Sequence, residues 1–576
     1  MDSTAQEKKE LYDLLDFTDV KKQMILNTLI TSDIFYESID VSQDVYKDTS
    51  IDKWAEKLPT LSGSKLLINK LIHNATNSKE ILLERQKTYG DYDIDFTIIE
   101  DYEDDVLWIY KLNQDIQANN LIHALFPSTF LVSYINYVEP LLEFYHIYKI
   151  YLTPINILLY PIITFFAPLY YVRNFLKFNV SIATYMKMLY NIIKMIFNYS
   201  GGIKAFLIKL ISMSFYAFLF FYNIYQTFEY CYMLYDVKNT LYKRISNLNI
   251  FLKAAMNIIN KVPKNIIKPF IKIPELSDFN SLVFNNSMTS VYKLWKNQTL
   301  KDNISKLLLS IYAIDIIHSV TTLTKRNNWS LSEYKDTEVS EHRTLESGIL
   351  GNVKMWNMKN PVLHHRQTGN PMDLSRNIVI TGPNAAGKTT YVKSILSNII
   401  LSQTFGICYA IKAETVLYDS IVSFMRISDV LGSKSYFEVE AEYCREMMMK
   451  ANTLSQNNMR GLFLMDEPMH STPPTEGMAT AFAVAEYIGN LPGANIILTT
   501  HFHKLTLLQN MYPDKFINLS VEAIPQEKGF FFPYTIKKGH SYQCIAIELL
   551  SSKDFPPSVI ESAINMKNKI YNEINK

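Results

Sequence analysis

The sequence predicts two kinds of fold in one chain, a helical N-terminal part and a C-terminal α/β domain with a mostly parallel sheet. Two observations predict the α/β domain. Residues 346–576 alternate short apolar strands with helical patterns, which is the order expected of parallel strands joined by helices. Within this region the apolar run 377–381 leads into a glycine-rich turn, residues 382–389, and a helical pattern follows to about residue 402.

The turn has the G-x-x-x-x-G-K-[ST] spacing of a P-loop. Its two glycines allow the backbone to curl so that successive N–H groups point at one phosphate group, and the next helix adds the partial positive charge of its N-terminus. Because a strand precedes the turn and a helix follows it, we predict a P-loop NTPase domain that binds ATP rather than a chance match in a loop. The predicted nucleotide-binding residues here are Gly382, Pro383, Asn384, Ala385, Ala386, Gly387, Lys388, Thr389 and Thr390.

Two further strand ends predict the rest of the site. Residues 461–467 form an apolar run that ends in Asp466 and Glu467, and residues 495–501 form another that ends in Thr-Thr-His501. We expect Asp466 to hold Mg²⁺ together with the Thr389 hydroxyl. Glu467 is the candidate catalytic residue that orients the attacking water, and His501 the one that contacts the γ-phosphate or the water. The sequence therefore predicts a Mg²⁺-dependent ATP hydrolase.

Ser435 opens the helical pattern between these two strands. A serine at a helix N-terminus is first of all a cap for free backbone N–H groups. The same geometry can hold the γ-phosphate of a nucleotide on a facing subunit. The spacing alone leaves both interpretations open.

Length and composition set broad limits on the whole protein. A chain of 576 residues suggests about three or four domains. The net charge of +1 gives no global basic footprint of the kind that marks a dedicated nucleic-acid binder. The cysteines lack C-x-x-C spacing, which fits a reduced compartment and argues against disulfides or a zinc site. The N-terminus is charged and has no apolar segment, so no secretory signal is expected.

The helical part is expected in two pieces, residues 1–124 and 241–345, separated by a different region. Residues 125–240 contain two runs without a charged residue, 150–172 and 210–228. Each run is long enough to cross a hydrocarbon core as a helix, and tyrosines are abundant around both. The first run is interrupted by Pro154, Pro161 and Pro168, which predicts a kinked or re-entrant helix.

The segment between the two runs is basic and has no acidic residue. If both runs cross a membrane, this basic segment lies opposite the ATPase, against the positive-inside tendency. A monotopic arrangement avoids that conflict, with residues 181–199 lying in the interface and their lysines toward anionic lipid head groups. The alternative is a soluble cytoplasmic or nuclear protein in which 125–240 is a buried helical core. We expect an intracellular, membrane-associated protein whose ATPase faces the cytoplasm.

Taken together, the motifs resemble the MutS mismatch-repair ATPases, in the same order along the chain. The resemblance covers about 230 C-terminal residues well and the helical core in patches, and it does not extend to residues 125–240. The matching segments are Thr381–Tyr391, Ser435-x-Phe437-x-x-Glu440, Leu464–Glu467, Thr500–Leu505, Tyr534-x-Ile536-x-x-Gly539-x-Ser541-Tyr542, Asn360–Leu363, Leu61–Leu67, Leu83–Gln86, Ala313–Ile317 and Arg326–Asn328.

This resemblance implies an ATPase domain of the ABC/MutS type at 346–576, behind a MutS-core-like helical part. It implies that Asn384 and Ser435 contact nucleotide, Ser435 in trans across a homodimer or a dimer with a related subunit, and that His501 senses the γ-phosphate. The C-terminal helix that begins near residue 555 looks like the family's dimerising end. ATP state would then be coupled to motion of helical arms, and double-stranded DNA becomes an expected partner alongside membrane lipids.

The departures from the family pattern concern DNA recognition. The core-like segment begins near residue 60, so we expect no mismatch-reading domain before it, and apolar runs stand where lever helices and a DNA clamp are expected. The alternative function is a soluble mismatch-repair or recombination-control protein. An ABC-type transporter is a third hypothesis, although the sequence lacks the Leu-Ser-Gly-Gly helix opening of such transporters.

Overall fold

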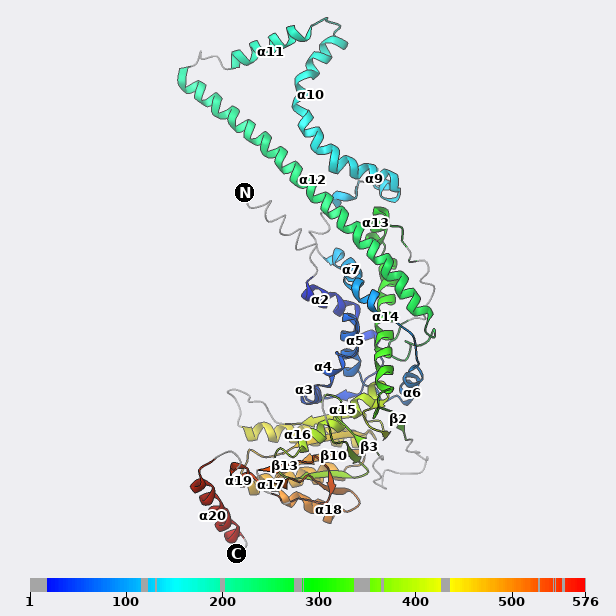
Figure 1. Cartoon of the computed structure of the whole chain (residues 1–576), viewed down its shortest axis with the longest axis vertical. Coiled ribbons are helices and arrows are strands. Elements are labelled where there is room, and N and C mark those ends of the chain that lie inside the picture. The colour runs from blue at the N-terminus through cyan, green and yellow to red at the C-terminus, as the bar shows by residue number, and fades with distance from the viewer. Residues whose placement is uncertain are drawn as a thin grey trace. The chain divides into compact units, whose positions relative to one another are not determined.

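The computed structural model describes residues 18–114, 123–129, 132–196, 202–273, 282, 284–335, 353–363, 367–425, 436–526, 529–541, 543, 545–551 and 555–574. The chain divides into two compact units (Figure 1). The helical unit comprises Met1–Leu29, Thr97–Asn257 and Asp278–Leu307, and the sheet unit comprises Ile30–Phe96, Ile258–Ser277 and Leu308–Lys576. Residues 1–124, expected as one helical segment, thus contribute to both units.

The sheet unit is built on a seven-stranded sheet that is parallel except at one edge. Its order is β1 (Asp40–Val41), β8 (Ser420–Phe424), β9 (Gly461–Asp466), β10 (Ala494–Thr499), β5 (Asn377–Thr381), β11 (Phe516–Ser520) and the antiparallel β14 (Lys537–Lys538). The central strands β5, β9 and β10 are buried along their whole length. This explains why they read as continuous apolar runs in the sequence.

Helices pack on this sheet and close its core. They are α15 (Lys388–Phe405), α16 (Tyr436–Gln456), α17 (Pro474–Asn490) and α18 (Leu507–Met511), with the 3₁₀ turn η5 (His503–Thr506) before the last. One core cluster joins α16 and α17 to the central strands and includes Met447, Phe463, Ile488, Leu498 and Phe516. The α/β architecture predicted for the C-terminal part is therefore present.

A second, mixed sheet of five strands completes the α/β part. Its order is β4 (Asn370–Asp373), β3 (Lys354–Met358), β7 (Lys412–Thr415), β2 (Ser330–Tyr334) and β6 (Ile407–Cys408). A short hairpin, β12 (Ile524–Pro525) and β13 (Phe530–Phe531), and the helices α19 (Ala546–Ser551) and α20 (Pro557–Ile574) follow.

The N-terminal piece of the sheet unit is tied to the α/β part by strand pairing and by buried polar groups. It contains η1 (Ser32–Ile34), β1, α3 (Gln43–Thr49), α4 (Ile51–Ala55), α5 (Ser62–His73) and α6 (Lys79–Lys87). Strand β1 extends the sheet by pairing in parallel with β8. The buried Arg85 guanidinium donates to the carbonyl oxygens of Pro269, at 2.8 Å, and Thr404.

The second half of α14 (Gln298–Thr324) is a core helix of this unit. Its length and composition would allow it to cross a membrane, but 78% of its most apolar window is buried inside the protein. The fully buried Asp315 accepts hydrogen bonds from the backbone N–H groups of Thr60 (3.0 Å) and Leu61 (2.9 Å), directly before α5. This carboxylate therefore caps α5, whose own N-cap residue Leu61 offers no side-chain acceptor.

The helical unit contains α2 (Asp19–Leu29), α7 (Thr97–Gln114), η2 (Ser133–Tyr137), α9 (Glu139–Ile147), the π-helical turn η3 (Tyr148–Leu152), α10 (Thr153–Asn174), α11 (Ile182–Ile196), α12 (Gly202–Asn260) and α13 (Met288–Lys296). Near α7, Arg244 pairs with Asp105 and lies over the Trp108 ring at 5.3 Å. The helix α10 continues through Pro161 and Pro168.

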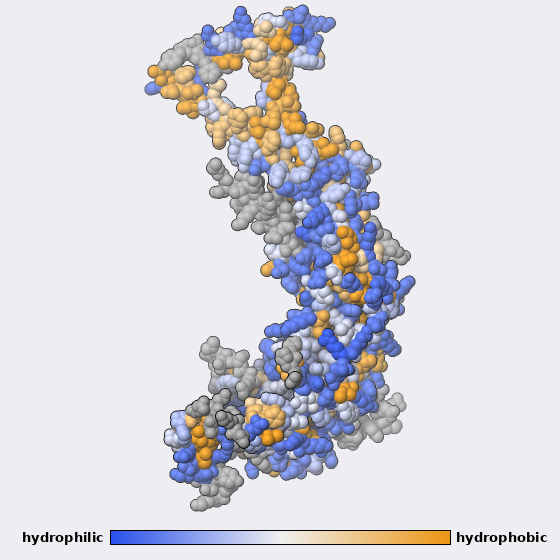
Figure 2. Space-filling view, viewed as in Figure 1, coloured by the Kyte–Doolittle hydropathy of each residue, from blue (hydrophilic) through white to orange (hydrophobic). Residues whose placement is uncertain are grey.

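The described residues of α9–α12 overturn the alternative that 125–240 is a buried core. In the most apolar windows of Glu139–Asn174 and Phe206–Asn260, 11% and 0% of the residues are buried inside the protein. Hydrophobic residues gather over this end of the helical unit (Figure 2). Figure 1 shows that α10 and α12 separate toward α11, and among the described residues many large apolar side chains of these two helices are exposed.

Candidate nucleotide site

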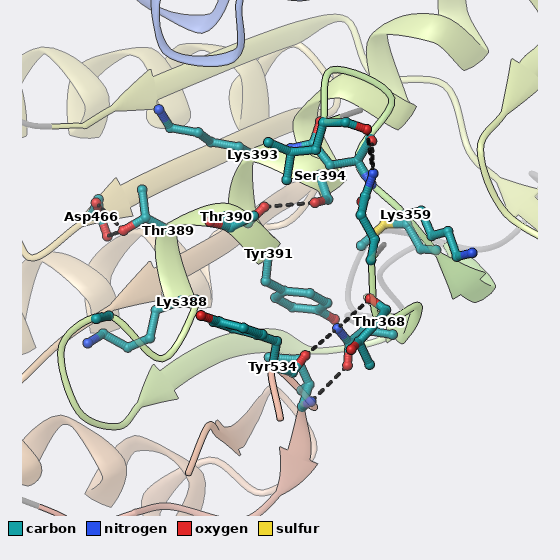
Figure 3. Close-up of a pocket in the computed structure, with 18 of the residues that line it drawn as sticks. Lys359, Thr368, Lys388, Thr389, Thr390, Tyr391, Lys393, Ser394, Asp466 and Tyr534 are labelled. Carbon is teal, nitrogen blue, oxygen red and sulfur yellow. Dashed lines mark hydrogen bonds between the residues drawn. The ribbon is translucent and has the colours of Figure 1, made fainter. Parts of the chain in front are cut away.

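The candidate site lies at the carboxyl ends of the three central parallel strands. Thr499, the last residue of β10, is opposite Asp466, the last residue of β9, and β10 pairs on its other side with β5. The glycine-rich turn leaves the end of β5 and leads into α15. Since parallel strands end at a common edge, the turn, Asp466 and Glu467 border one cleft, which has a volume of about 810 Å³ (Figure 3).

The turn needs glycine at its two ends. Gly382 has a φ of 143° and Gly387 a φ of 95°, conformations that side chains rarely adopt. A Cβ atom on Gly382 would lie 2.4 Å from the carbonyl oxygen of Val521, which is a direct clash. Ala385, with a φ of 65°, adopts the left-handed conformation without being glycine, and such strain is concentrated at functional sites.

The Lys388 ammonium group lies inside the curl of the turn. Its Nζ donates to the carbonyl oxygens of Gly382 (2.9 Å) and Pro383 (3.3 Å) and lies 3.9 Å from Glu467 Oε1. The side chain is 5% exposed, so its charge is held within the cleft. A phosphate group in the cleft would find a buried cation beside a helix N-terminus, which is a favourable anion site.

Thr389 and Asp466 offer the oxygen atoms that Mg²⁺ prefers. The Thr389 hydroxyl donates to Asp466 Oδ2 at 2.9 Å, and the Thr499 hydroxyl donates to Asp466 Oδ1, so the carboxylate is fixed from two sides. The described residues contain no group of three His, Cys, Asp or Glu that could hold a metal ion. The hydroxyl and carboxylate oxygens of Thr389 and Asp466 fit Mg²⁺, which keeps several waters and binds one or two protein groups plus substrate phosphates.

His501 connects the P-loop with the second acidic residue. Its Nε2 atom lies 2.8 Å from Asn384 Oδ1 and 2.7 Å from Glu467 Oε1. Glu467 has a φ of 54°, and its backbone N–H is held by the carbonyl oxygen and hydroxyl of Thr499 at 3.1 and 3.2 Å. This strained backbone aims the Glu467 carboxylate into the cleft beside Lys388.

The structure thus brings together the predicted site residues of the turn and of the β9 and β10 ends. Ser435 lies outside the described residues. The nearby Glu440 on α16 is buried and accepts a hydrogen bond from the Ser471 backbone N–H at 3.2 Å, which ties α16 to the segment after Glu467.

Tyr534 is a cleft residue to which the sequence reasoning assigned no role. Its ring is half exposed and lies beside the P-loop, with its nearest atom 3.0 Å from the Cβ position of Gly387 (Figure 3). Asn370 fixes the backbone around it, donating to the Tyr534 carbonyl oxygen at 2.9 Å and accepting from the Ile536 N–H at 2.8 Å. An exposed aromatic face here is suited to stack on a nucleotide base. Tyr534 is the first residue of the motif Tyr534-x-Ile536-x-x-Gly539 in the sequence. An aromatic residue at that position was the signal that could have identified it.

Asp48 is the second residue that the sequence reasoning missed. It comes from α3, which follows the edge strand β1, and it lines the cleft. The Ser423 hydroxyl donates to its Oδ2 at 2.7 Å across 375 positions of sequence. Burial raises the pKa of the Asp48 carboxyl, while Ser423 and the charge of Lys393 act in the opposite direction. No local pattern marks such a residue, because only the β1–β8 pairing brings it to the site.

Comparison with known proteins matches this region to one family. Residues 378–571 match the family model described as MutS domain V. A DNA mismatch repair protein MutS from Exiguobacterium sp. is 26% identical over 314 residues, covering 53% of this chain and 35% of the relative. Proteins of the same name from Oceanobacillus iheyensis and Fusobacterium nucleatum are 28% and 27% identical, over 47% and 52% of this chain and 30% and 33% of the relatives. The chain spans about a third of the length of these relatives.

Proposed function

The chain is a divergent MutS-family protein, and from this premise we propose that its sheet unit binds Mg-ATP and hydrolyses it to ADP and phosphate. The observation that carries the proposal is the arrangement at the strand ends. The buried lysine and the threonine of the P-loop, an aspartate bonded to that threonine, and a glutamate all border one cleft, and a histidine contacts the glutamate. Phosphoryl transfer is catalysed mainly by positioning and by stabilising negative charge, and these groups are suited to both.

Each group has a separate task in this proposal. Lys388 and the backbone N–H groups of the turn hold the β- and γ-phosphates, while Thr389 and Asp466 hold Mg²⁺. The metal ion neutralises charge on the phosphate oxygens when bound. Glu467 orients a water molecule for attack on the γ-phosphorus, and the bond from that phosphorus to the bridging oxygen breaks. His501 keeps the Glu467 carboxylate in place and links it to Asn384 in the P-loop.

The test is steady-state phosphate release by the full-length chain with Mg-ATP. Lys388→Ala is expected to abolish turnover, because it removes the buried cation of the cleft. Lys354→Ala is the matched control, since Lys354 is a partly exposed lysine on β3 that does not line the cleft. Turnover that is equal in the Lys388→Ala variant and the parent protein would refute the assignment.

We also propose that two copies of the chain, or this chain and a related subunit, form a dimer with Ser435 acting across the interface. Family resemblance supports this proposal. Light scattering of the purified chain with and without ATP measures the mass directly. A Ser435→Ala variant should bind ATP but lose turnover, and mixing it with Lys388→Ala should restore part of the activity, because one composite site then contains both residues. No recovery at any mixing ratio would count against action in trans.

Membrane attachment through residues 125–240 is the third part of the proposal. The exposed apolar surfaces of α10 and α12 support it, since each of these helices is long and apolar enough to cross a membrane. The full-length chain should stay in the membrane pellet after carbonate extraction. Release into the supernatant would show that no part of the chain is embedded.

A role on DNA is the second candidate function, and the names of the relatives favour it. In that case the chain would bind mismatched or branched duplexes, with affinity that falls steeply as salt rises, because phosphate contacts release counterions. Fluorescence anisotropy with branched and plain duplexes at low and physiological salt measures this. Absence of binding at low salt would exclude the DNA role for this chain.

A further inference from the structure

The two charge-free runs of α10 and α12 start side by side. The Cys231 thiol on α12 donates to the carbonyl oxygen of Lys149, which directly precedes the run 150–172. About two helical turns further from the runs, Lys238 pairs with Glu143 at 2.7 Å. We call the region of these two contacts the base of the hairpin, and α12 lies beside α9 and the turn after it there. Both positively and negatively charged residues are present at the base, as the Lys238–Glu143 pair shows.

From the base, both runs extend over the thickness of a bilayer. At 1.5 Å per residue, the run 150–172 is about 34 Å long and the run 210–228 about 28 Å long. The hydrocarbon core of a bilayer is about 30 Å thick. Large apolar side chains on both runs are exposed, among them Ile163, Tyr170, Phe215 and Phe221. Two runs that leave one level and have nearly the same length are expected of a hairpin that crosses a membrane.

The far end of the hairpin, which we call the tip, is purely basic. No Asp or Glu stands between Glu143 and Glu229. With the exception of Lys149 at the base, every basic residue of this stretch lies between the two runs. They are Arg173, Lys177, Lys187, Lys194, Lys204 and Lys209. The chemistry that complements such a layer is a surface of negative charge.

The helix α11 joins the far ends of α10 and α12 and is amphipathic (Figure 1). Thr184, Lys187, Asn191 and Lys194 recur at spacings of three and four residues and therefore form one polar stripe. Most of the remaining surface is apolar and exposed, with Met188, Ile192 and Met195 between 52% and 77% exposed, while Tyr185 contacts Phe165 of α10. A helix with this pattern lies in the head-group layer, with its lysines toward the phosphates and its apolar side toward the acyl chains.

We propose that α10 and α12 cross the bilayer as a hairpin and that α11 lies in the head-group layer opposite the base, where Lys187 and Lys194 bind anionic lipids. The proposal rests on the proposed membrane attachment and adds its topology and lipid class. It differs from the monotopic arrangement, because an in-plane helix needs a polar face and the runs of α10 and α12 have no charged residue. A second copy of the chain is a poor partner for the tip, since two basic tips repel each other.

The positive-inside tendency does not exclude this topology. Lys238, Lys243 and Arg244 follow the run 210–228 within about 16 residues, on its base side, and Lys149 directly precedes the run 150–172. Basic residues therefore flank the spans on both sides, and the bias between the two sides is small.

Cysteine labelling in sealed vesicles tests the topology. The full-length variants Asn179→Cys, at the tip, and Asn239→Cys, at the base, are reconstituted in vesicles of phosphatidylcholine and phosphatidylglycerol and treated with a membrane-impermeant maleimide, with the parent protein as background. Both positions are exposed. A spanning hairpin predicts complementary labelling, in which the labelled fractions of the two variants add up to about the whole, and complete labelling of both after detergent. Nearly complete labelling of both variants in intact vesicles, or almost none of either, would overturn the spanning hairpin while leaving attachment intact, because the two labelled fractions would then not add up to the whole. Failure of the protein to float with the vesicles would instead refute membrane attachment itself.

Lipid retention tests the role of α11. The full-length chain is extracted with mild detergent from vesicles containing equal amounts of the two lipids, and the retained ratio of phosphatidylglycerol to phosphatidylcholine is measured. The parent protein should be enriched in phosphatidylglycerol, and the Lys187→Gln/Lys194→Gln variant should lose up to about fivefold of that enrichment per lysine, the equivalent of about 1 kcal/mol each. The control Lys243→Gln/Lys253→Gln removes two exposed lysines of α12 beyond the base. An equal loss in the control, or none in the α11 variant, would overturn the assignment of anionic-lipid binding to α11.

Discussion

Replacing Glu467 with glutamine isolates the residue that we assign to the attacking water. In the parent protein, His501 Nε2 lies 2.7 Å from Glu467 Oε1. The glutamine amide keeps the size of the side chain and has an oxygen that can accept the same hydrogen bond. What it removes is the negative charge and the ability to take a proton. The fold of the site should therefore survive, while the chemical step loses its base.

The expected loss follows from the role of the group. A positioned general base contributes about 10²- to 10⁴-fold to a rate, which is about 3–5 kcal/mol of transition-state stabilisation. ATP affinity should be unchanged or slightly higher, because Glu467 places a negative charge 3.9 Å from Lys388 Nζ, where phosphate also binds. The effect should therefore appear in kcat and leave the affinity for ATP intact.

Single-turnover phosphate release and equilibrium binding of a fluorescent ATP analogue measure these two quantities separately. Glu84→Gln is the matched control, because Glu84 is an exposed glutamate on α6 that does not line the cleft. A Glu467→Gln variant with a turnover within about threefold of the parent would refute the assigned role. A variant that no longer binds ATP would show that Glu467 holds the site together rather than acting on water.

Three further predictions concern other parts of the sheet unit. Asp315→Ala should lower the free energy of unfolding by about 3–5 kcal/mol, as seen by chemical denaturation, because two backbone N–H groups before α5 lose a buried charged acceptor. Asp48→Asn should weaken Mg-ATP binding or turnover without changing the unfolding midpoint, whereas Asp44→Asn on the same helix, at a position that does not line the cleft, should change neither. Burial lowers the pKa of His318 below its ordinary 6.5, and Lys325 lowers it further. The unfolded chain then binds protons more readily than the folded one, so the free energy of unfolding should fall as the pH drops through and below 6.5. The unfolding midpoint should therefore fall between pH 7.5 and pH 5.5, and it should fall less in a His318→Gln variant than in the parent protein.

The parts of the site that local sequence could predict are those in which spacing and strand order decide the geometry. Gly382 and Gly387 are required by their φ angles, and Gly382 also by its close contact with Val521, so the glycines of the motif follow directly from the backbone conformation. Asp466 and His501 follow buried parallel strands, whose carboxyl ends share one edge of the sheet. The prediction of a MutS-type family is confirmed by the match to MutS domain V.

The remaining parts depend on contacts between distant segments. Asp48 reaches the cleft only because β1 pairs with β8, and a two-residue strand gives no periodic signal. Tyr534 is placed by two hydrogen bonds of Asn370, which donates to the Tyr534 carbonyl oxygen and accepts from the Ile536 N–H, and no spacing rule connects Asn370 with Tyr534. Their length and lack of charge could mark residues 150–172 and 210–228 as spans. That Cys231, just after one run, contacts Lys149, just before the other, is visible only in three dimensions. The buried-core alternative failed for this reason, because composition does not tell whether an apolar helix has a protein neighbour.

We propose that one chain joins a MutS-type ATPase to a membrane. The most direct measurement is Mg-ATP-dependent phosphate release by carbonate-washed membranes that contain the full-length chain, compared with membranes that contain the Lys388→Ala variant at equal amount. We expect the activity to stay with the washed membranes and to be lost in the variant. Activity that leaves with the carbonate supernatant, or that persists in the Lys388→Ala membranes, would contradict it.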